Sequence, residues 1–248
     1  MKTKKIISAG PLVLEAVYPR ASRWDSPRAR GAKRKLSSEA QQRQNAKYSY
    51  QKLELMLAAN FAPGDLILAL TYDDEHLPRS REAANARLKR FRLELGLLRK
   101  CSGRELRMIW ATENVFGLGR WHHHCVINST GEDFETIRQL WVCGDNVEIR
   151  KLKIDKDHSY ESLARYMCKE ARERPGLRSW SYTRNCRKPE VETFAVPDDT
   201  PLQPPKGATV YVDERKSTEF GAWRVVKYLA PNWRAELRRP PAKRRRRR

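Results

Sequence analysis

The sequence predicts an α+β fold in which a mainly antiparallel central β-sheet is flanked by helices. Helical and strand-like segments alternate along the chain in the order helix, strand, helix, hairpin, helix, strand, helix. Two of the strand-like segments are joined by a short glycine-containing turn, which favours antiparallel pairing. Apolar residues make up 40% of the 248 residues, which suffices for one good-sized domain with appendages or for two small domains.

The first half of the predicted domain holds two helices around one strand. The capping box Ser38-Glu39-Ala40-Gln41 begins a helix that we expect to reach about residue 59. Residues 66–72 are almost continuously apolar, so we predict a strand buried on both faces. A second helix is predicted from about residue 82 to residue 100, because apolar residues follow helical spacing at Ala84, Leu88, Phe91, Leu95 and Leu98.

A hairpin and two further helices follow. Residues 106–113 are predicted to form a strand that turns at Gly117-Leu118-Gly119 and pairs with a strand at about 121–127. A short helix near 134–141, a strand at 147–150 and a long helix at about 160–173, capped by Ser159, complete the order. Beyond Pro189 a hairpin is expected to pair residues 209–212 with residues 223–228.

Charge divides the chain more clearly than hydrophobicity does. Lys and Arg number 51 against 30 Asp and Glu, a formal net charge of +21. Much of this excess lies at the two ends, because residues 1–47 hold 12 basic and 3 acidic residues and residues 233–248 hold 9 and 1. Such cationic ends favour binding to polyanions, and nucleic acid is the expected partner.

The composition and charge predict four segments. They are a basic N-terminal arm (1–35), a central domain (36–190), a C-terminal extension containing the possible hairpin (191–232) and an Arg-rich tail (233–248). Most of the arm is expected to be mobile, with at most one short docked strand around Ile6 and Leu12–Val17. The chain contains no run of about 18 apolar residues, so a membrane segment is not expected. Five cysteines without a Cys-x-x-Cys pair favour reduced thiols in the cytoplasm.

The segment Trp121-His122-His123-His124-Cys125 is the strongest sign of a functional site. Alternate residues of a strand point to the same face, so His122 and His124 project side by side and provide two imidazole ligands for a metal ion. Glu113 ends the preceding strand, and the hairpin folds it back beside the histidines as a third ligand. Mn²⁺ or Mg²⁺ suits such a set, although imidazole also accepts Zn²⁺, Co²⁺ or Ni²⁺. His123 is expected to face away, although a ligand register that includes it remains an alternative.

Tyr166 and Lys169 lie one helical turn apart and suggest a nucleophile with its activating cation. Phenols ionise only at high pH, so a nucleophilic tyrosine needs a nearby positive charge, which Lys169 supplies. Attack on a phosphodiester would give a covalent phosphotyrosine. Tyr160 is the rival nucleophile but points away from the Tyr166 side, and Glu170 is either a salt-bridge partner or an additional metal ligand.

Residues 60–190 resemble the HUH endonucleases, specifically the single-tyrosine rolling-circle replication initiators of plasmids and phages. The resemblance is carried by the strand ending Leu70-Thr71-Tyr72, by Glu113 with His122-His123-His124, and by Tyr166-Met167-Cys168-Lys169. It departs from the family at His123, where a hydrophobic residue is usual. It implies a ferredoxin- or RRM-like sheet, a divalent metal and nicking of single-stranded DNA at a replication origin through a 5′-phosphotyrosine.

The resemblance also implies partners and alternatives. No Gly-x-x-x-x-Gly-Lys-Ser/Thr loop is present, so a host helicase and polymerase in a bacterial cytoplasm would be needed. Further basic residues are expected to bind DNA: Arg120, Arg165, Arg172, Lys243, Arg244 and Arg245. A transposase or relaxase with the same chemistry, or a non-catalytic basic nucleic-acid-binding protein, is the alternative.

Overall fold

The computed structural model describes residues 1–20, 38–114, 119–157, 159–169, 179–218, 221–231 and 233. It divides the chain into two compact units. We call Arg34–Arg187 the central unit, and Met1–Lys33 together with Lys188–Arg248 the terminal unit. Each unit contains one five-stranded antiparallel sheet, so the predicted α+β class is confirmed.

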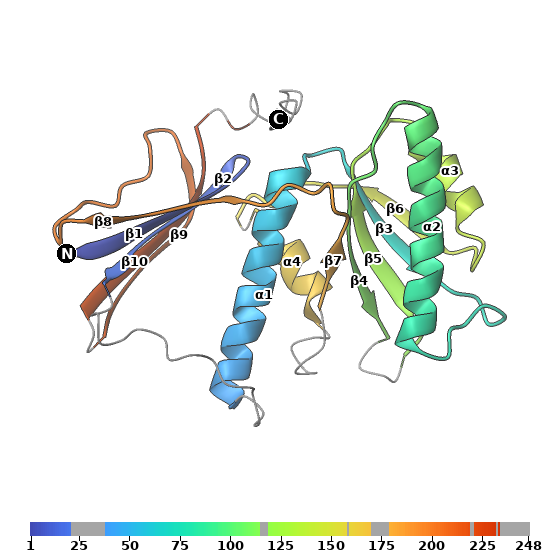
Figure 1. Cartoon of the computed structure of the whole chain (residues 1–248), viewed down its shortest axis with the longest axis horizontal. Coiled ribbons are helices and arrows are strands. Elements are labelled where there is room, and N and C mark those ends of the chain that lie inside the picture. Colours follow the sequence, from blue (N-terminus) through green and yellow to red (C-terminus); the bar gives the residue numbers. More distant parts are fainter. Residues whose placement is uncertain are drawn as a thin grey trace, which may run out of the picture. The chain divides into compact units, whose positions relative to one another are not determined.

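The central unit carries all four helices that the structure describes (Figure 1). In chain order its elements are α1 (Glu39–Asn60), β3 (Leu66–Thr71), α2 (Arg81–Cys101), β4 (Met108–Glu113), β5 (His122–Ile127), α3 (Asp133–Leu140), β6 (Val147–Lys151), α4 (Glu161–Met167) and β7 (Ser181–Tyr182). The strand order is β6-β3-β5-β4-β7. From β3 to β6 the chain follows the β-α-β-β-α-β order of ferredoxin-like folds, which confirms the predicted type of sheet.

Alternation along the strands decides what each face of this sheet contacts. Leu66, Leu68 and Leu70 of β3 are buried and belong to the apolar core that includes α2 and α3. The intervening residues Ile67 and Ala69 are only half-buried, so the prediction that this strand is buried on both faces holds for one face. In Figure 1, α2 and α3 lie on one side of the sheet and α1 and α4 lie on the other.

Helix α2 follows the predicted apolar stripe except at its end. Ser80 caps it by accepting a hydrogen bond from the Ala83 amide, and Ala84, Leu88, Phe91 and Leu95 are buried as predicted. The prediction is wrong for Leu98, which is 49% exposed. The buried residue of the last turn is Arg99, whose guanidinium pairs with the buried carboxylate of Asp133.

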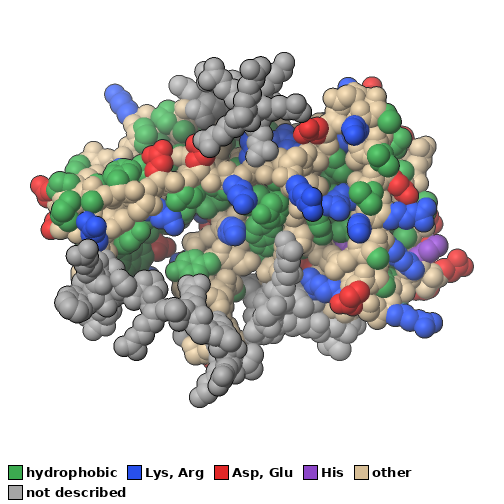
Figure 2. Space-filling view, viewed as in Figure 1, with side chains coloured by type: hydrophobic (Ala, Val, Ile, Leu, Met, Phe, Trp, Pro, Cys, Tyr) green, Lys and Arg blue, Asp and Glu red, His purple; other side chains and the backbone are tan. Residues whose placement is uncertain are grey.

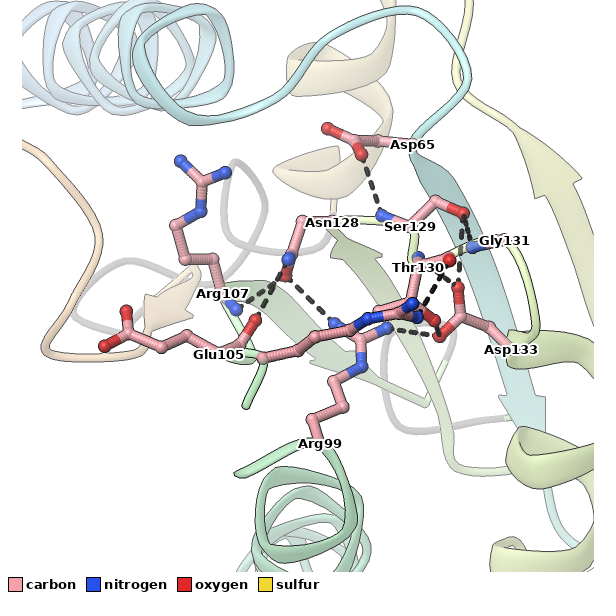
Figure 3. A network of polar contacts seen from close by, with 10 residues as sticks. Asp65, Arg99, Glu105, Arg107, Asn128, Ser129, Thr130, Gly131 and Asp133 are labelled. Atoms are coloured by element: carbon pink, nitrogen blue, oxygen red, sulfur yellow. Dashed lines mark hydrogen bonds and ion pairs between the residues drawn. The ribbon is translucent and has the colours of Figure 1, made fainter. Parts of the chain in front are cut away.

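A polar network joins the end of α2 to the loop that follows β5 (Figure 3). Arg99 donates to Asp133 Oδ1 at 2.7 Å and to Asn128 Oδ1 at 3.0 Å. Asp133 also accepts from the amide and hydroxyl of Thr130, each at 2.6 Å, and Asn128 accepts from the Arg107 amide. Because nearly every buried polar atom of this network has a partner, it fixes the β5–α3 loop at one end of the sheet.

Two predicted helix starts differ in detail from the structure. Ser38 caps α1 by accepting from the Gln41 amide, but the Gln41 side chain donates to Asn45 instead of reaching back, so only half of the capping box forms. Ser159 does not cap α4, since its φ of 57° lies in the left-handed region and Tyr160 takes the cap position. Residues 170–178, including Glu170 and Arg172, lie outside the described residues.

The first part of the predicted mobile arm is folded structure in the terminal unit. Residues Lys2–Ala9 (β1) and Leu12–Pro19 (β2) form a hairpin that turns at Gly10, whose φ is 57°. β1 also pairs with β8 (Glu190–Val196), and β2 pairs with β10 (Gly221–Leu229). The prediction of a mobile arm with at most one short docked strand is therefore wrong for residues 2–19, because β8 and β10, which complete the pairing of this hairpin, lie far away in the sequence.

The predicted C-terminal hairpin is confirmed and is longer than expected, since β9 (Thr209–Thr218) pairs with β10. The strand order of the terminal unit is β8-β1-β2-β10-β9. Residues 21–37 and the Arg-rich tail from residue 234 onward lie outside the described residues. Among the described helices, none is long and apolar enough to cross a membrane. On the face shown in Figure 2, Lys and Arg side chains recur across the central unit with fewer acidic ones among them.

Candidate metal and nucleophile site

The site is built on β5, which lies between β3 and β4 in the sheet. His122 pairs in register with Glu113 of β4, so their side chains project from the same face as neighbours. His124, two residues further along, lies on that face between Ala69 of β3 and Ala111 of β4. The small side chain of Ala69 leaves space beside the imidazole of His124, and both residues line a cleft.

The three predicted ligands are brought together. Glu113 Oε2 lies 3.6 Å from His122 Nε2 and 3.7 Å from His124 Nε2. One ligand atom from each residue lies within 4.8 Å of the others, and the imidazole rings of the two histidines are 4.8 Å apart. This is a buried Glu/His/His group that can bind a metal ion.

The hydrogen bonding of the group leaves its acceptor atoms free for such an ion. Both carboxylate oxygens of Glu113 and the Nε2 of His124 are buried and make no hydrogen bond within the described residues. The Nδ1 of His122 lies 3.1 Å from the Arg120 carbonyl oxygen and donates to it, which directs Nε2 toward Glu113. Apart from the ion pair between Glu113 Oε2 and Lys169, these buried acceptors lack donors, which costs free energy, and a bound cation would remove that cost.

Burial and neighbouring charges set the ionisation of the ligands in the sense that a metal requires. Burial tends to raise the pKa of Glu113, but His122, His124 and Lys169 outweigh it and hold that pKa below its ordinary value. Burial lowers the pKa of His124 to about 4, with Glu113 opposing the shift. At neutral pH Glu113 is therefore a carboxylate and His124 is a neutral imidazole with a lone pair on Nε2.

His123 does not contribute to this group. Its ring is fully buried on the opposite face, where Nε2 lies 2.7 Å from the Tyr72 hydroxyl and Nδ1 lies 2.9 Å from Thr112 Oγ1. Burial lowers its pKa to about 3. Both nitrogens are therefore occupied by structural hydrogen bonds, and the alternative ligand register is not the one that the structure adopts.

Helix α4 carries Tyr166 to the same face of the sheet. Ala164 and Met167 anchor the helix in the core, which leaves Tyr166 45% exposed beside the site. The ring of Tyr166 lies 4.6 Å from the ring of His124. Its rival Tyr160 is buried and donates its hydroxyl proton to the Phe61 carbonyl, away from the ligands.

Lys169 links the tyrosine to the carboxylate. Its Nζ lies 3.1 Å from Glu113 Oε2 and 4.1 Å from the centroid of the Tyr166 ring. The ammonium is thus placed against the buried carboxylate, on the side of the group that faces α4. Sequence reasoning expected Lys169 beside Tyr166 but did not identify this ion pair with Glu113.

The donor set fits a divalent cation. Glu113 offers a carboxylate oxygen, and His122 and His124 each offer an imidazole Nε2, so all three predicted residues would hold the ion together. One carboxylate and two imidazoles are ligands that Mn²⁺ accepts, as do several other divalent ions. Three protein ligands leave coordination positions for other oxygen atoms.

A cleft of about 820 Å³ opens beside the tyrosine in the central unit. Its walls comprise Ile67, Ala69, His124, Arg150, Lys151, Lys153, Leu163 and Tyr166. Arg150 and Lys151 belong to β6, which is an edge strand of the sheet, and Lys153 follows two residues after its end. Sequence reasoning missed them, although the run Arg150-Lys151-Leu152-Lys153 directly after a strand was a usable signal.

The basic residues predicted from the sequence are placed less directly. Arg120 pairs with Asp74 and donates to the Tyr72 carbonyl. Arg165 pairs with Glu161 and lies over the ring of Tyr50, on the α1 side of the helix. Arg172, Lys243, Arg244 and Arg245 fall outside the described residues.

Residues 65–172 match the model of a protein family described as replication-associated protein of the ORF2 type. The matched segment begins at β3 and contains Glu113, the histidine strand, Tyr166 and Lys169. This match supports a replication initiator of Rep-like type. No curated protein matches the chain. No solved structure matches it either.

Proposed function

We propose that this protein is a metal-dependent DNA nicking and joining enzyme that initiates rolling-circle replication through a 5′-phosphotyrosine. The observation that carries the proposal is the position of an exposed tyrosine against a buried, hydrogen-bond-deficient ligand group, with 4.6 Å between the rings of Tyr166 and His124. The family match favours replication over DNA mobilisation by a transposase or relaxase.

Tyr166 is the proposed nucleophile. In the reaction its phenolic oxygen forms a bond to phosphorus while the bond from phosphorus to the 3′ oxygen breaks, and the 3′ oxygen takes up a proton equivalent to the one that the phenol loses. The products are a free 3′ hydroxyl and a tyrosine joined to the 5′ phosphate. One phosphodiester replaces another, so the reverse reaction can rejoin the strand without ATP.

Lys169 and the ligand group share the handling of charge. A bound divalent cation supplies neutralisation of the phosphate oxygens. Lys169 lies against both the Tyr166 ring and Glu113, where its charge attracts the scissile phosphate toward the tyrosine. Glu113, His122 and His124 hold the cation, and Arg120 orients His122 through its carbonyl oxygen.

The cleft beside Tyr166 provides a path for the substrate strand. Arg150, Lys151 and Lys153 offer cations for the phosphates, while Ile67, Ala69 and Leu163 form an apolar surface for sugars or bases. Single-stranded or locally melted DNA suits this arrangement, because the scissile phosphate must reach a tyrosine that helix α4 holds over one face of the sheet. Arg120, Arg165, Arg172 and the tail residues Lys243, Arg244 and Arg245 remain proposed DNA contacts.

The decisive experiment replaces Tyr166 by Phe. The wild-type protein, incubated with Mn²⁺ and a library of single-stranded DNA, is expected to yield a covalent adduct that survives denaturation, and sequencing of the trapped strands identifies the cleavage site. Tyr166→Phe removes only the attacking oxygen, so we expect no adduct and unchanged DNA binding in an anisotropy assay.

The matched control is Tyr160→Phe at the N-cap of the same helix. It loses one buried hydrogen bond to Phe61 but no group that faces the ligands, so its adduct yield should equal that of the wild type. An adduct formed by Tyr166→Phe, or wild-type cleavage that persists in EDTA, would contradict the proposal.

A further inference from the structure

The terminal unit holds a cavity of about 380 Å³, apart from the segment that matches the replication family. Val17 and Leu202, both buried, contribute its apolar floor. Four basic side chains line it, and none of its described lining residues is acidic: the basic ones are Lys2, Arg215, Lys216 and Arg224. This size falls within the range of sites that bind small molecules or single residues of a polymer.

Two arginines of this lining face each other across a strand pair. Arg215 of β9 lies directly opposite Arg224 of β10 in the register. Like charges placed opposite each other in a sheet are destabilising unless something of opposite charge lies between or beside them. Asp213 pairs with Arg224 through two contacts, at 2.7 and 2.6 Å, and so neutralises one of the two.

The other three cations form no ion pair with a carboxylate among the described residues. Arg215 makes no hydrogen bond there either, and it acts on Asp213 only at longer range, where its charge helps to lower the pKa of that carboxyl. Lys2 donates to the backbone carbonyl of Asp198 at 2.8 Å, which is a neutral acceptor. Lys216 lies over the ring of Trp223, with its Nζ 5.6 Å from the centroid. The cavity is therefore a concentration of excess positive charge with an apolar floor.

We infer that this cavity binds the phosphodiester backbone of single-stranded nucleic acid. Phosphate matches the planar donor array of arginine, and the apolar floor matches a sugar or base attached to that phosphate. A strand bound here would be held by a sheet that contributes no residue to the metal group, so the site is a second anchor for nucleic acid. The inference needs neither Tyr166 nor a metal, and it stands or falls independently of the nicking reaction.

The first test compares two double variants of the full-length protein that remove the same charge. Arg215→Gln with Lys216→Gln alters the cavity, whereas Lys188→Gln with Lys206→Gln removes two exposed lysines of the same unit that do not line it. Binding to a fluorescein-labelled oligothymidylate is measured by anisotropy in EDTA over a range of salt concentrations. EDTA and a homopolymer exclude contributions from the metal group and from a specific origin.

The cavity variant is expected to bind the oligonucleotide about tenfold more weakly. The slope of log affinity against log salt concentration should become shallower by roughly 1 to 1.5, because two phosphate contacts on a single strand are lost. The control variant should change affinity by less than about twofold. Equal losses in both variants would overturn the inference. An acidic polypeptide such as polyglutamate that competes as well as the oligonucleotide would also overturn it, in favour of a protein partner.

A second measurement tests which lysine side chains the bound oligonucleotide covers. Lysine side chains of the wild-type protein are acetylated with and without the oligonucleotide and quantified by mass spectrometry. Lys2 and Lys216 should be protected several-fold more than Lys188 and Lys206, whatever other parts of the chain bind. Protection that is equal at all four positions would contradict the inference. Both double variants should still form the Tyr166 adduct at saturating DNA, which separates this result from a failure of the nicking proposal.

Discussion

Two groups of buried polar residues lie at opposite ends of β5 and have opposite hydrogen-bonding character. After the strand, the Asp133 carboxylate accepts from Arg99, Thr130 and Ser129, and among the fully buried side-chain atoms of that network only the Arg99 Nε lacks a partner (Figure 3). At the start of the strand, the Glu113 carboxylate has an ion pair with Lys169, but its histidine neighbours lie at 3.6 and 3.7 Å and no well-oriented hydrogen bond reaches either oxygen within the described residues.

The difference separates a structural group from one that awaits a ligand. A satisfied network stabilises a loop, and breaking it leaves a buried charge without a partner. An unsatisfied polar group lowers the stability of the metal-free protein, and binding of a cation raises that stability. The comparison therefore predicts two kinds of effect. Substitutions in the network after β5 should lower the free energy of unfolding, and substitutions in the group at the start of β5 should weaken metal binding.

The largest expected effect is on stability, from Asp133→Ala. The change leaves Arg99 buried with no carboxylate partner, so the free energy of unfolding should fall by about 3–5 kcal/mol. Urea denaturation measures this loss, and the Mn²⁺ affinity of the folded protein should not change. Glu94→Ala breaks an exposed ion pair with Arg90 and serves as the control, with an expected loss below about 1 kcal/mol. Similar losses in the two variants would contradict the view that the network around Asp133 stabilises the fold.

The next effect is on metal binding, from His124→Ala. The loss of one imidazole ligand should weaken Mn²⁺ binding by at least about 100-fold, since the loss of even an outer-shell partner costs roughly 10- to 100-fold. The electron paramagnetic resonance signal of free Mn²⁺ measures this change. His76→Ala is the matched control, because His76 pairs with Asp73 near the surface and takes no part in the ligand group. A His124→Ala protein that binds Mn²⁺ as tightly as the wild type would show that the group is not a metal site.

A smaller effect concerns pH and His123, the histidine between the two ligands. Burial lowers its folded pKa to about 3, whereas in the unfolded chain it gains a proton near its ordinary value. The unfolded state therefore binds more protons as the pH falls below about 6.5, and this one residue should lower the free energy of unfolding by about 2 kcal/mol between pH 7 and pH 5.

His123→Gln tests that assignment, since glutamine is polar but does not titrate. Denaturation curves at the two pH values should show a pH dependence that is smaller by about the same 2 kcal/mol. The residual dependence should include His124, whose pKa is shifted in the same direction. A variant with the full wild-type pH dependence would show that His123 is not the buried neutral imidazole described above.

The smallest effect sharpens the role of Lys169. Its ammonium lies 3.1 Å from the Glu113 carboxylate, so it competes with an incoming cation for the same negative charge. Lys169→Met should therefore tighten Mn²⁺ binding several-fold while the adduct forms more slowly. Lys151→Met, in the cleft but without contact to Glu113, should leave Mn²⁺ binding unchanged. Weaker Mn²⁺ binding by Lys169→Met would mean that Lys169 supports the ligands instead of competing with the cation.

The sequence predicted the central unit well because its signals are local. Period-two alternation places His122 and His124 on one face, and helical spacing identifies α2 up to its last turn. It failed where a distant partner decides the outcome. Leu98 is exposed because Arg99 turns inward to Asp133, which lies more than thirty residues away. The β1–β2 hairpin looked like a flexible arm, because its other partners, β8 and β10, come from the far end of the chain.

The same long-range pairing constrains the order of events during synthesis. β1 is made before the central unit, whereas its partner β8 begins at Glu190, after the whole central unit has been made. The central unit is continuous in sequence and has its own core, so it can fold while translation continues. The β1–β2 hairpin keeps two open edges until β8 and β10 emerge, and throughout that interval the lysine side chains of β1 disfavour pairing of its edge with other chains.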